Sequence, residues 1–165
     1  MNVFGLTGVA EIILLNCMIW LFIHLAAAWA CSRVPGEWFD ARVFPYRHRR
    51  WERQGRFYQT VFRVKAWKSM LPDLGRFRKK RLASSDSAYL NQFLAESCRA
   101  ELTHLVVILV VPLFVIWNNW LAAACMVPYV LLENLPCVIA QRYNRGRLLR
   151  ILDWSPREAD ARSVR

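Results

Sequence analysis

Two ionisable residues on one turn of a predicted helix are the strongest candidates for chemistry in this sequence. Glu101 and His104 lie three residues apart at the start of a long apolar stretch, so a helix places both side chains on one face. A carboxylate that holds one imidazole nitrogen leaves the other as a general base. Ionisable groups are costly inside a membrane and by default face a protein interior or a water-filled site. The pair therefore predicts a site of proton transfer.

A polar turn inside the apolar stretch is expected to bring further groups to this pair. Residues 102–140 are apolar nearly throughout, and two asparagines at 118–119 break the stretch near its middle. If the chain folds back at this turn, residue 133 lies level with residue 104. We therefore expect Glu133 and Asn134 near His104, at the cytoplasmic side of a helical hairpin.

Basic and polar residues are predicted where this hairpin emerges from the membrane. Such cations by default set the topology of a membrane protein, and the alternative is that they hold a phosphate or an acidic protein surface. With two lysines of the preceding loop, the candidate substrate-binding residues are Lys65, Lys68, Arg99, Glu133, Arg142, Tyr143, Asn144 and Arg145.

Each histidine also has a structural interpretation. Glu101 and His104 could form a pair that only fixes the hairpin, and the sequence gives this equal weight. His24 stands alone in its apolar stretch, which favours a helix-packing hydrogen bond. His48 lies among arginines and is expected to be solvated.

Several enzyme classes are excluded because their residues are missing. A single E-x-x-H cannot hold a di-iron centre. The sequence has no H-E-x-x-H, G-x-S-x-G, P-loop, G-x-G-x-x-G or H-x-x-x-x-D acyltransferase box. The five cysteines contain no C-x-x-C pair and are expected to be buried thiols, so neither a metal site nor a disulfide is predicted.

Three apolar spans must position these residues. Residues 9–31 are long enough for one span, since a membrane helix needs about 20 apolar residues. The asparagine turn, flanked by Trp117 and Trp120, divides the second apolar stretch into two short spans. We therefore predict an all-α integral membrane protein with about three transmembrane helices, one N-terminal span plus a C-terminal helical hairpin.

The distribution of charge predicts the orientation. Fourteen of the 23 Lys and Arg residues lie between Arg42 and Arg81, and seven more follow Gln141. The positive-inside rule then places the N-terminus outside and the C-terminus in the cytoplasm of a bacterial cell membrane. A cleaved signal peptide is disfavoured because no basic segment precedes the first span.

The predicted divisions of the single membrane domain are a span at 9–31, a basic, aromatic cytoplasmic or interfacial region at 33–86, a helix entering the membrane at 87–117, a span at 120–140 and a basic cytoplasmic tail at 141–165. A helix is expected over residues 57–71, ended by Pro72-Asp73 and Gly75. The basic loop favours an anionic lipid or a phosphate ligand over nucleic acid as its partner.

Residues 84–86 form a Ser-Ser-Asp cluster that is expected to cap the next helix. Pro112 should kink that helix, and Pro128 and Pro136 should bend the returning one.

Five stretches carry a resemblance to a known family: RVPGEWF at 33–39, WERQGRFY at 51–58, VKAWK at 64–68 with LPD at 71–73, RAELTH at 99–104, and NLP at 134–136 running into QRYNR at 141–145 and RL at 147–148. Their order and spacing resemble the glycosyl-4,4′-diaponeurosporenoate acyltransferases, small bacterial membrane enzymes of staphyloxanthin-type carotenoid biosynthesis. The resemblance implies transfer of a fatty acyl chain to a sugar hydroxyl of a glycosylated lipid in the bilayer, the glucose C6 hydroxyl in the carotenoid case.

For this reaction we hypothesise that His104, oriented by Glu101, deprotonates the hydroxyl, and that Asn134 or a backbone N–H near Pro136 stabilises the oxyanion. The acyl donor would be an acyl-CoA or an acyl carrier protein, without a further cofactor. Lys65, Lys68, Arg142 and Arg145 would hold its phosphates or its acidic face.

Two alternatives stay open at this point. One is an acyltransferase for another membrane glycolipid or envelope sugar, and the other is a non-enzymatic membrane scaffold or lipid-binding subunit. Self-association is also expected to be possible, since three short spans expose much apolar surface.

Overall fold

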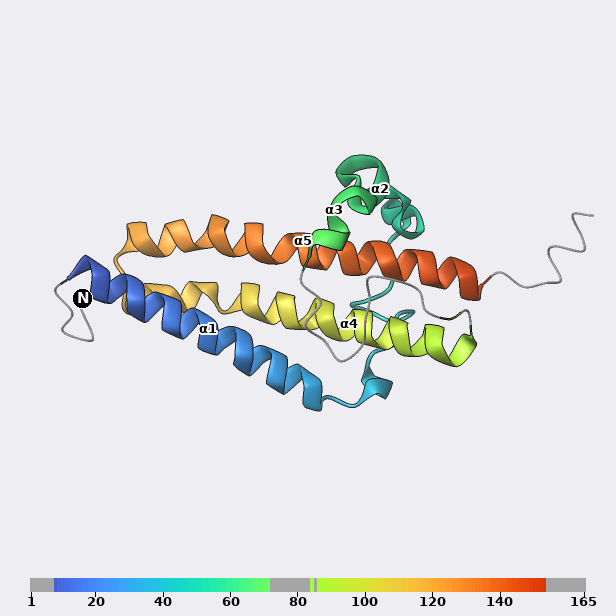
Figure 1. Ribbon diagram of the computed structural model, residues 1–165, viewed down its shortest axis with the longest axis horizontal. Coiled ribbons are helices and arrows are strands. Elements are labelled where there is room, and N and C mark those ends of the chain that lie inside the picture. Colours follow the sequence, from blue (N-terminus) through green and yellow to red (C-terminus); the bar gives the residue numbers. More distant parts are fainter. Residues whose placement is uncertain (1–7, 72–83, 85, 154–165) are drawn as a thin grey trace, which may run out of the picture. The chain divides into compact units, whose positions relative to one another are not determined.

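The computed structural model describes residues 8–71, 84 and 86–153, and in these residues it contains helices and no strand (Figure 1). The long helices are α1 (Val9–Arg33), α4 (Ser87–Leu109), continued by the 3-10 helix η4 (Val111–Ile116), and α5 (Trp120–Leu152). All three, with η4 counted as part of α4, are long and apolar enough to cross a membrane. The prediction of an all-α membrane protein with an N-terminal span and a C-terminal hairpin is confirmed.

Short helical segments connect α1 to α4. They are η1 (Gly36–Trp38), η2 (Arg50–Gly55), α2 (Arg56–Phe62), α3 (Val64–Trp67) and η3 (Lys68–Met70). The prediction of one continuous helix over residues 57–71 is wrong, because Arg63 adopts a left-handed conformation with φ 49° that ends α2. The side chain of Gln59 accepts the backbone N–H of Lys65 and so stabilises the break. The predicted stop at Pro72-Asp73 and Gly75 lies outside the described residues.

The ends of the long helices follow their sequence. The Asp86 carboxylate accepts the backbone N–H groups of Ala88 and Tyr89, so the predicted cap of α4 is confirmed. At Pro112 the chain changes from α4 to the 3-10 helix η4, in which the proline occupies one of the first two positions and needs no N–H donor. Helix α5 contains both of its prolines and continues to Leu152, well past the predicted end at residue 140.

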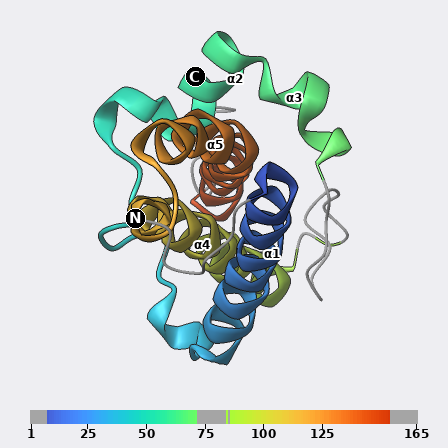
Figure 2. The same ribbon diagram turned by 90° about the vertical axis from the view of Figure 1, so that its left-hand side faces the viewer.

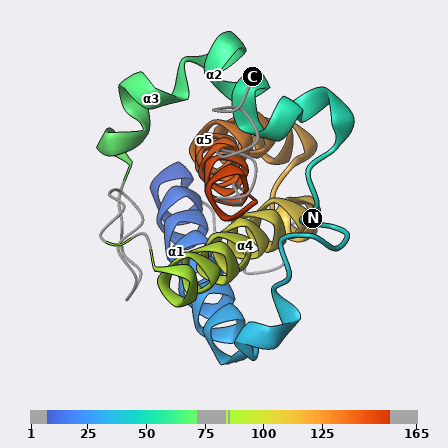
Figure 3. The same ribbon diagram turned by 90° about the vertical axis from the view of Figure 1, so that its right-hand side faces the viewer.

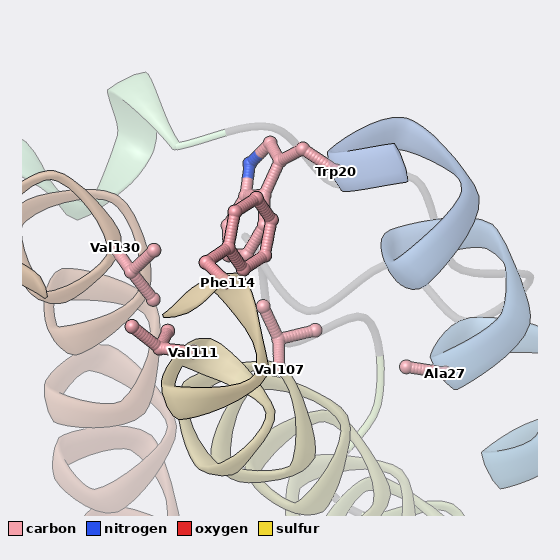
Figure 4. Packing of buried hydrophobic residues seen from close by; sticks show 6 residues of the cluster. All are labelled: Trp20, Ala27, Val107, Val111, Phe114 and Val130. Atoms are coloured by element: carbon pink, nitrogen blue, oxygen red, sulfur yellow. The ribbon is translucent and has the colours of Figure 1, made fainter. Parts of the chain in front are cut away.

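The chain divides into two compact units, and the first consists of Met1–Pro35 with Arg99–Val138. Its apolar core joins α1 to the parts of α4, η4 and α5 that belong to this unit (Figures 1 and 2). Trp20 meets Phe114 edge to face, with 5.9 Å between the ring centroids. Figure 4 shows these two rings together, with Val107, Val111 and Val130 beside them.

A hydrogen-bonded amide pair holds α1 to the turn before α5 within this unit. Asn16 and Asn118 exchange two side-chain hydrogen bonds of 2.9 Å, and Asn16 also accepts the indole N–H of Trp117 at 2.8 Å. Because lipid offers no competing partners, such bonds fix the register of neighbouring membrane helices.

The second unit consists of Gly36–Cys98 with Ile139–Arg165. Its core packs Tyr58 of α2 and Val64 of α3 against Ala140 and Tyr143 of α5, and the short helices lie beside that part of α5 in Figures 1 and 3. The close approach depends on Gly146, where a Cβ would come within 2.4 Å of the Gln54 backbone.

Candidate functional site

The first unit contains an oriented histidine. His104, on α4, is half-buried, and its Nδ1 lies 2.8 Å from the Oδ1 of Asn134 on α5. Asn134 is fully buried and its amide N–H donates to the carbonyl of Val130 one turn earlier, which fixes the amide with its oxygen toward the histidine. An amide oxygen only accepts, so Nδ1 carries the proton and Nε2 carries the lone pair in the neutral ring.

Glu101 lies one helical turn before His104 on α4 and is only 1% exposed. The structure thus brings His104 and Asn134 together as the folding of the hairpin predicts, and it buries the candidate carboxylate on the same helix. Asn134 occupies the place of an orienting residue, because its amide oxygen is directed at the imidazole.

Glu133, the neighbour of Asn134, is directed toward α1. Its carboxylate accepts the indole N–H of Trp20 at 3.0 Å and lies 3.5 Å from Nε2 of His24. The Trp20 and His24 rings also meet edge to face at 4.7 Å. His24 is therefore placed beside a carboxylate, and these contacts join α5 to α1 within the first unit.

Arg99 binds the end of α1. Its Nη1 donates to the carbonyls of Cys31 and Val34, both at 2.6 Å. A helix C-terminus leaves carbonyls without intrahelical partners, and a cation stabilises them through both hydrogen bonding and the helix dipole. This candidate substrate-binding residue therefore occupies a capping position.

The second unit is built around Glu52, a carboxylate that is fully buried. Its oxygens lie 2.5 Å from Nη1 of Arg142 and 2.5 Å from Nδ1 of His48, and Arg142 also donates to the carbonyl of Pro45. The expectation that His48 is solvated is wrong, because its side chain is 8% exposed and is drawn inward by Glu52.

The charge state of this group follows from its contacts. Burial alone would raise the pKa of Glu52, but the hydrogen bond from His48 and the positive charge of Arg142 outweigh burial and lower the pKa to about 2. Burial raises the pKa of the neighbouring Tyr58 phenol, and the Glu52 charge raises it further. Glu52 is therefore ionised at neutral pH, and Arg142 is held by an internal partner.

The remaining candidates of this unit gather around Tyr143. Lys68 donates to the Asn144 Oδ1 at 2.6 Å and lies over the Tyr143 ring, with Nζ 5.1 Å from its centroid. Arg145 is fully buried, with its guanidinium over the Tyr46 ring and Nη1 3.6 Å from the Cys98 sulfur. Lys65 is exposed on α3.

Sequence reasoning gave no role to three residues that the structure places at key contacts. Glu52 and His48 are four residues apart, a spacing visible in the sequence, but the surrounding arginines suggested a solvated run. Arg147 was placed in a family stretch but was likewise given no role, although its guanidinium lies 5.9 Å from the Tyr143 ring centroid.

Comparisons with known proteins agree with the resemblance seen in the sequence. A family model described as glycosyl-4,4′-diaponeurosporenoate acyltransferase matches residues 35–154. A curated protein of that name from Staphylococcus aureus (strain bovine RF122 / ET3-1) is 31% identical over 142 residues, which covers 82% of this chain and 84% of the relative. The protein of the same name from strain USA300 is 29% identical over the same length.

No solved structure matches the chain. The family match nevertheless includes most of the chain and contains both His104 with Asn134 and the Glu52 group. The chain therefore belongs to the glycosyl-4,4′-diaponeurosporenoate acyltransferase family and is an acyltransferase.

Proposed function

We propose that this chain transfers a fatty acyl group from a thioester to a sugar hydroxyl of a glycosylated carotenoid held in the membrane. Its relatives are named glycosyl-4,4′-diaponeurosporenoate acyltransferases, and a glycosyl group offers hydroxyls as acceptors. The three apolar helices suit an acceptor with a long apolar chain and a polar head.

The contact of 2.8 Å between His104 Nδ1 and Asn134 Oδ1 is the observation that carries this proposal. It selects the tautomer in which Nε2 is the basic nitrogen, and it holds the ring between two helices. Histidine is the commonest general base in enzymes, and a hydrogen bond to one ring nitrogen positions the other for proton transfer.

In the proposed reaction the sugar hydroxyl oxygen attacks the thioester carbonyl while Nε2 of His104 takes the hydroxyl proton. The tetrahedral intermediate then collapses, the carbon–sulfur bond breaks, and the thiolate leaves and takes up the proton from the imidazolium. An ester and a free thiol are the products. Glu101, buried one turn away, would stabilise the imidazolium that forms in between.

The proposal requires an acyl-CoA or an acyl carrier protein as co-substrate, and no cofactor. The proposal includes a bacterial cell membrane as the location, with the N-terminus outside and the C-terminus in the cytoplasm. Membrane lipid and further copies of the same chain are the proposed partners within the bilayer. The cytoplasmic side is where acyl thioesters are available and where the basic residues concentrate.

Mass spectrometry of pigments from a host that makes glycosylated carotenoids, with and without this gene, tests the proposal. We expect a new species that is heavier by one fatty acyl group, with the acyl chain released by mild base as expected for an ester. If another glycolipid gains the acyl mass and the carotenoid does not, the acceptor is wrong. If no lipid gains it while the protein accumulates, the reaction is wrong.

A further inference from the structure

Lys68 and Arg147 lie at the same aromatic ring in the second unit. Lys68 Nζ is 5.1 Å and Arg147 Cζ is 5.9 Å from the Tyr143 ring centroid. Lys68 comes from η3 and Arg147 from α5, so two elements distant in sequence supply the two cations. Lys65, one turn before Lys68, adds a third nearby charge.

Cations this close repel one another. Burial and, to a lesser extent, the positive charges of Arg147 and Lys65 together lower the pKa of Lys68 to about 8. The contact from Lys68 to Asn144 is to a neutral amide oxygen, which orients the ammonium without cancelling its charge. The fold thus holds several positive charges together, in contrast to Arg142, which has the Glu52 carboxylate.

A phosphate group suits this arrangement. It carries negative charge and several acceptor oxygens, so it can accept hydrogen bonds from a lysine and an arginine together. Arg147 and Lys65 are exposed and Lys68 is half-buried, whereas Tyr143 and Asn144, which Lys68 contacts, are buried. The cations are therefore accessible and rest on a fixed support.

We propose that Lys68 and Arg147, with Lys65 beside them, form a phosphate-binding site anchored on Tyr143 and Asn144. The ligand that we assign to this site rests on the proposed function and deepens it: the site binds the phosphates of an acyl-CoA donor. The same chemistry would recognise the phosphate of an anionic lipid headgroup, so the experiment separates these two sources.

The experiment measures acyl transfer by the purified full-length protein from two donors that share one thioester. Acyl-CoA carries phosphates, and the acyl thioester of N-acetylcysteamine carries none. We expect Lys68→Met and Arg147→Gln each to raise KM for acyl-CoA about tenfold or more, as the loss of a hydrogen bond to a charged group implies, with kcat and the kinetics of the second donor unchanged. Arg49→Gln, which removes an exposed cation of the same unit, should change neither.

Binding gives a readout that does not need turnover. Adenosine 3′,5′-bisphosphate, the nucleotide end of CoA, should bind the wild type and Lys68→Arg, and should bind Lys68→Met and Arg147→Gln about tenfold more weakly or worse. A protein that binds this probe but transfers no acyl group from any donor would support the site and contradict the proposed function.

The other outcomes are equally distinct. If the variants lose only their stimulation by phosphatidylglycerol vesicles, the phosphate is that of a lipid headgroup and the phosphate site stands. If the kinetics of both donors measured without vesicles change alike, or if neither the donor kinetics nor the vesicle stimulation changes, or if only an acyl carrier protein donor is affected, the phosphate site is wrong.

Discussion

At the scale of single residues, specific partners meet two polar side chains that this protein buries fully, those of Glu52 and Asn134. Glu52 is fully buried between His48 and Arg142, and Asn134 is fully buried between His104 and its own helix. A buried charge that loses its partner costs far more than an exposed one, so each of these groups has a definite and testable role.

Glu52→Gln should destabilise the second unit strongly. It leaves Arg142 and His48 without their carboxylate, and breaking a buried pair on one side costs about 3–5 kcal/mol. The loss of stability is measured by the unfolding midpoint in detergent and by the amount of protein that accumulates in the membrane. Glu37→Gln, at an exposed carboxylate, should change neither. Equal stability of the two variants would contradict a structural role for Glu52.

The pH dependence of the same stability has a definite sign. The pKa of Glu52 falls from 4.5 to about 2 on folding, so its contribution is fully present above about pH 4.5 and is lost as the pH falls toward 2. The wild type should lose stability over this range, and Glu52→Gln should not show that part of the loss.

The sequence alone predicted some of these residues and missed others for physical reasons. His104 and Asn134 could be placed together because a hairpin turn makes positions on its two helices correspond. The direction of Glu133 toward Trp20 could not be predicted, because hairpin register says nothing about the packing of α1. His48 was misjudged because a pattern of neighbouring charges does not show which side chain turns inward.

At the scale of elements, the side chain of Arg99 on α4 caps the C-terminal end of α1. Arg99→Met should lower the unfolding midpoint, since it removes two charge-assisted hydrogen bonds of about 1.5–3 kcal/mol each from the carbonyls of Cys31 and Val34. If Arg99 is only a cap, KM for the acyl donor should stay unchanged in the folded fraction. A raised KM without loss of stability would instead make Arg99 a substrate-binding residue.

The long helices could be predicted from the sequence, but the short ones could not. Apolar length and the Asp86 cap define α1, α4 and α5 locally. The break between α2 and α3 depends on the left-handed Arg63 and on the contact from Gln59, which no periodicity shows. Helix α5 also continues past residue 140, because its polar continuation packs against α2 and α3.

At the scale of the whole molecule, the long helices expose apolar side chains that a membrane would cover. Phe22 on α1 is 71% exposed and Leu132 on α5 is 76% exposed. Large apolar side chains on the outside of a helix suit contact with lipid. The distribution of Lys and Arg then sets the expected orientation.

Thiol labelling of intact cells tests this orientation. In a variant that lacks its five native cysteines, a membrane-impermeant reagent should label Trp120→Cys, which lies at the α4–α5 turn and is 79% exposed. Arg49→Cys should be labelled only after the membrane is opened. The reverse pattern would invert the topology and place the basic residues away from the acyl donor.

The central claim is that His104 is the general base of acyl transfer. Its most direct test is to measure the rate of ester formation by membranes that contain equal amounts of wild type, His104→Ala or Thr103→Ala. Thr103 is the matched control, because its hydroxyl donates to the Arg99 carbonyl of its own helix. A general base contributes about 10²–10⁴-fold, so His104→Ala should lose about this much rate while Thr103→Ala keeps it. Undiminished ester formation by His104→Ala would contradict the account.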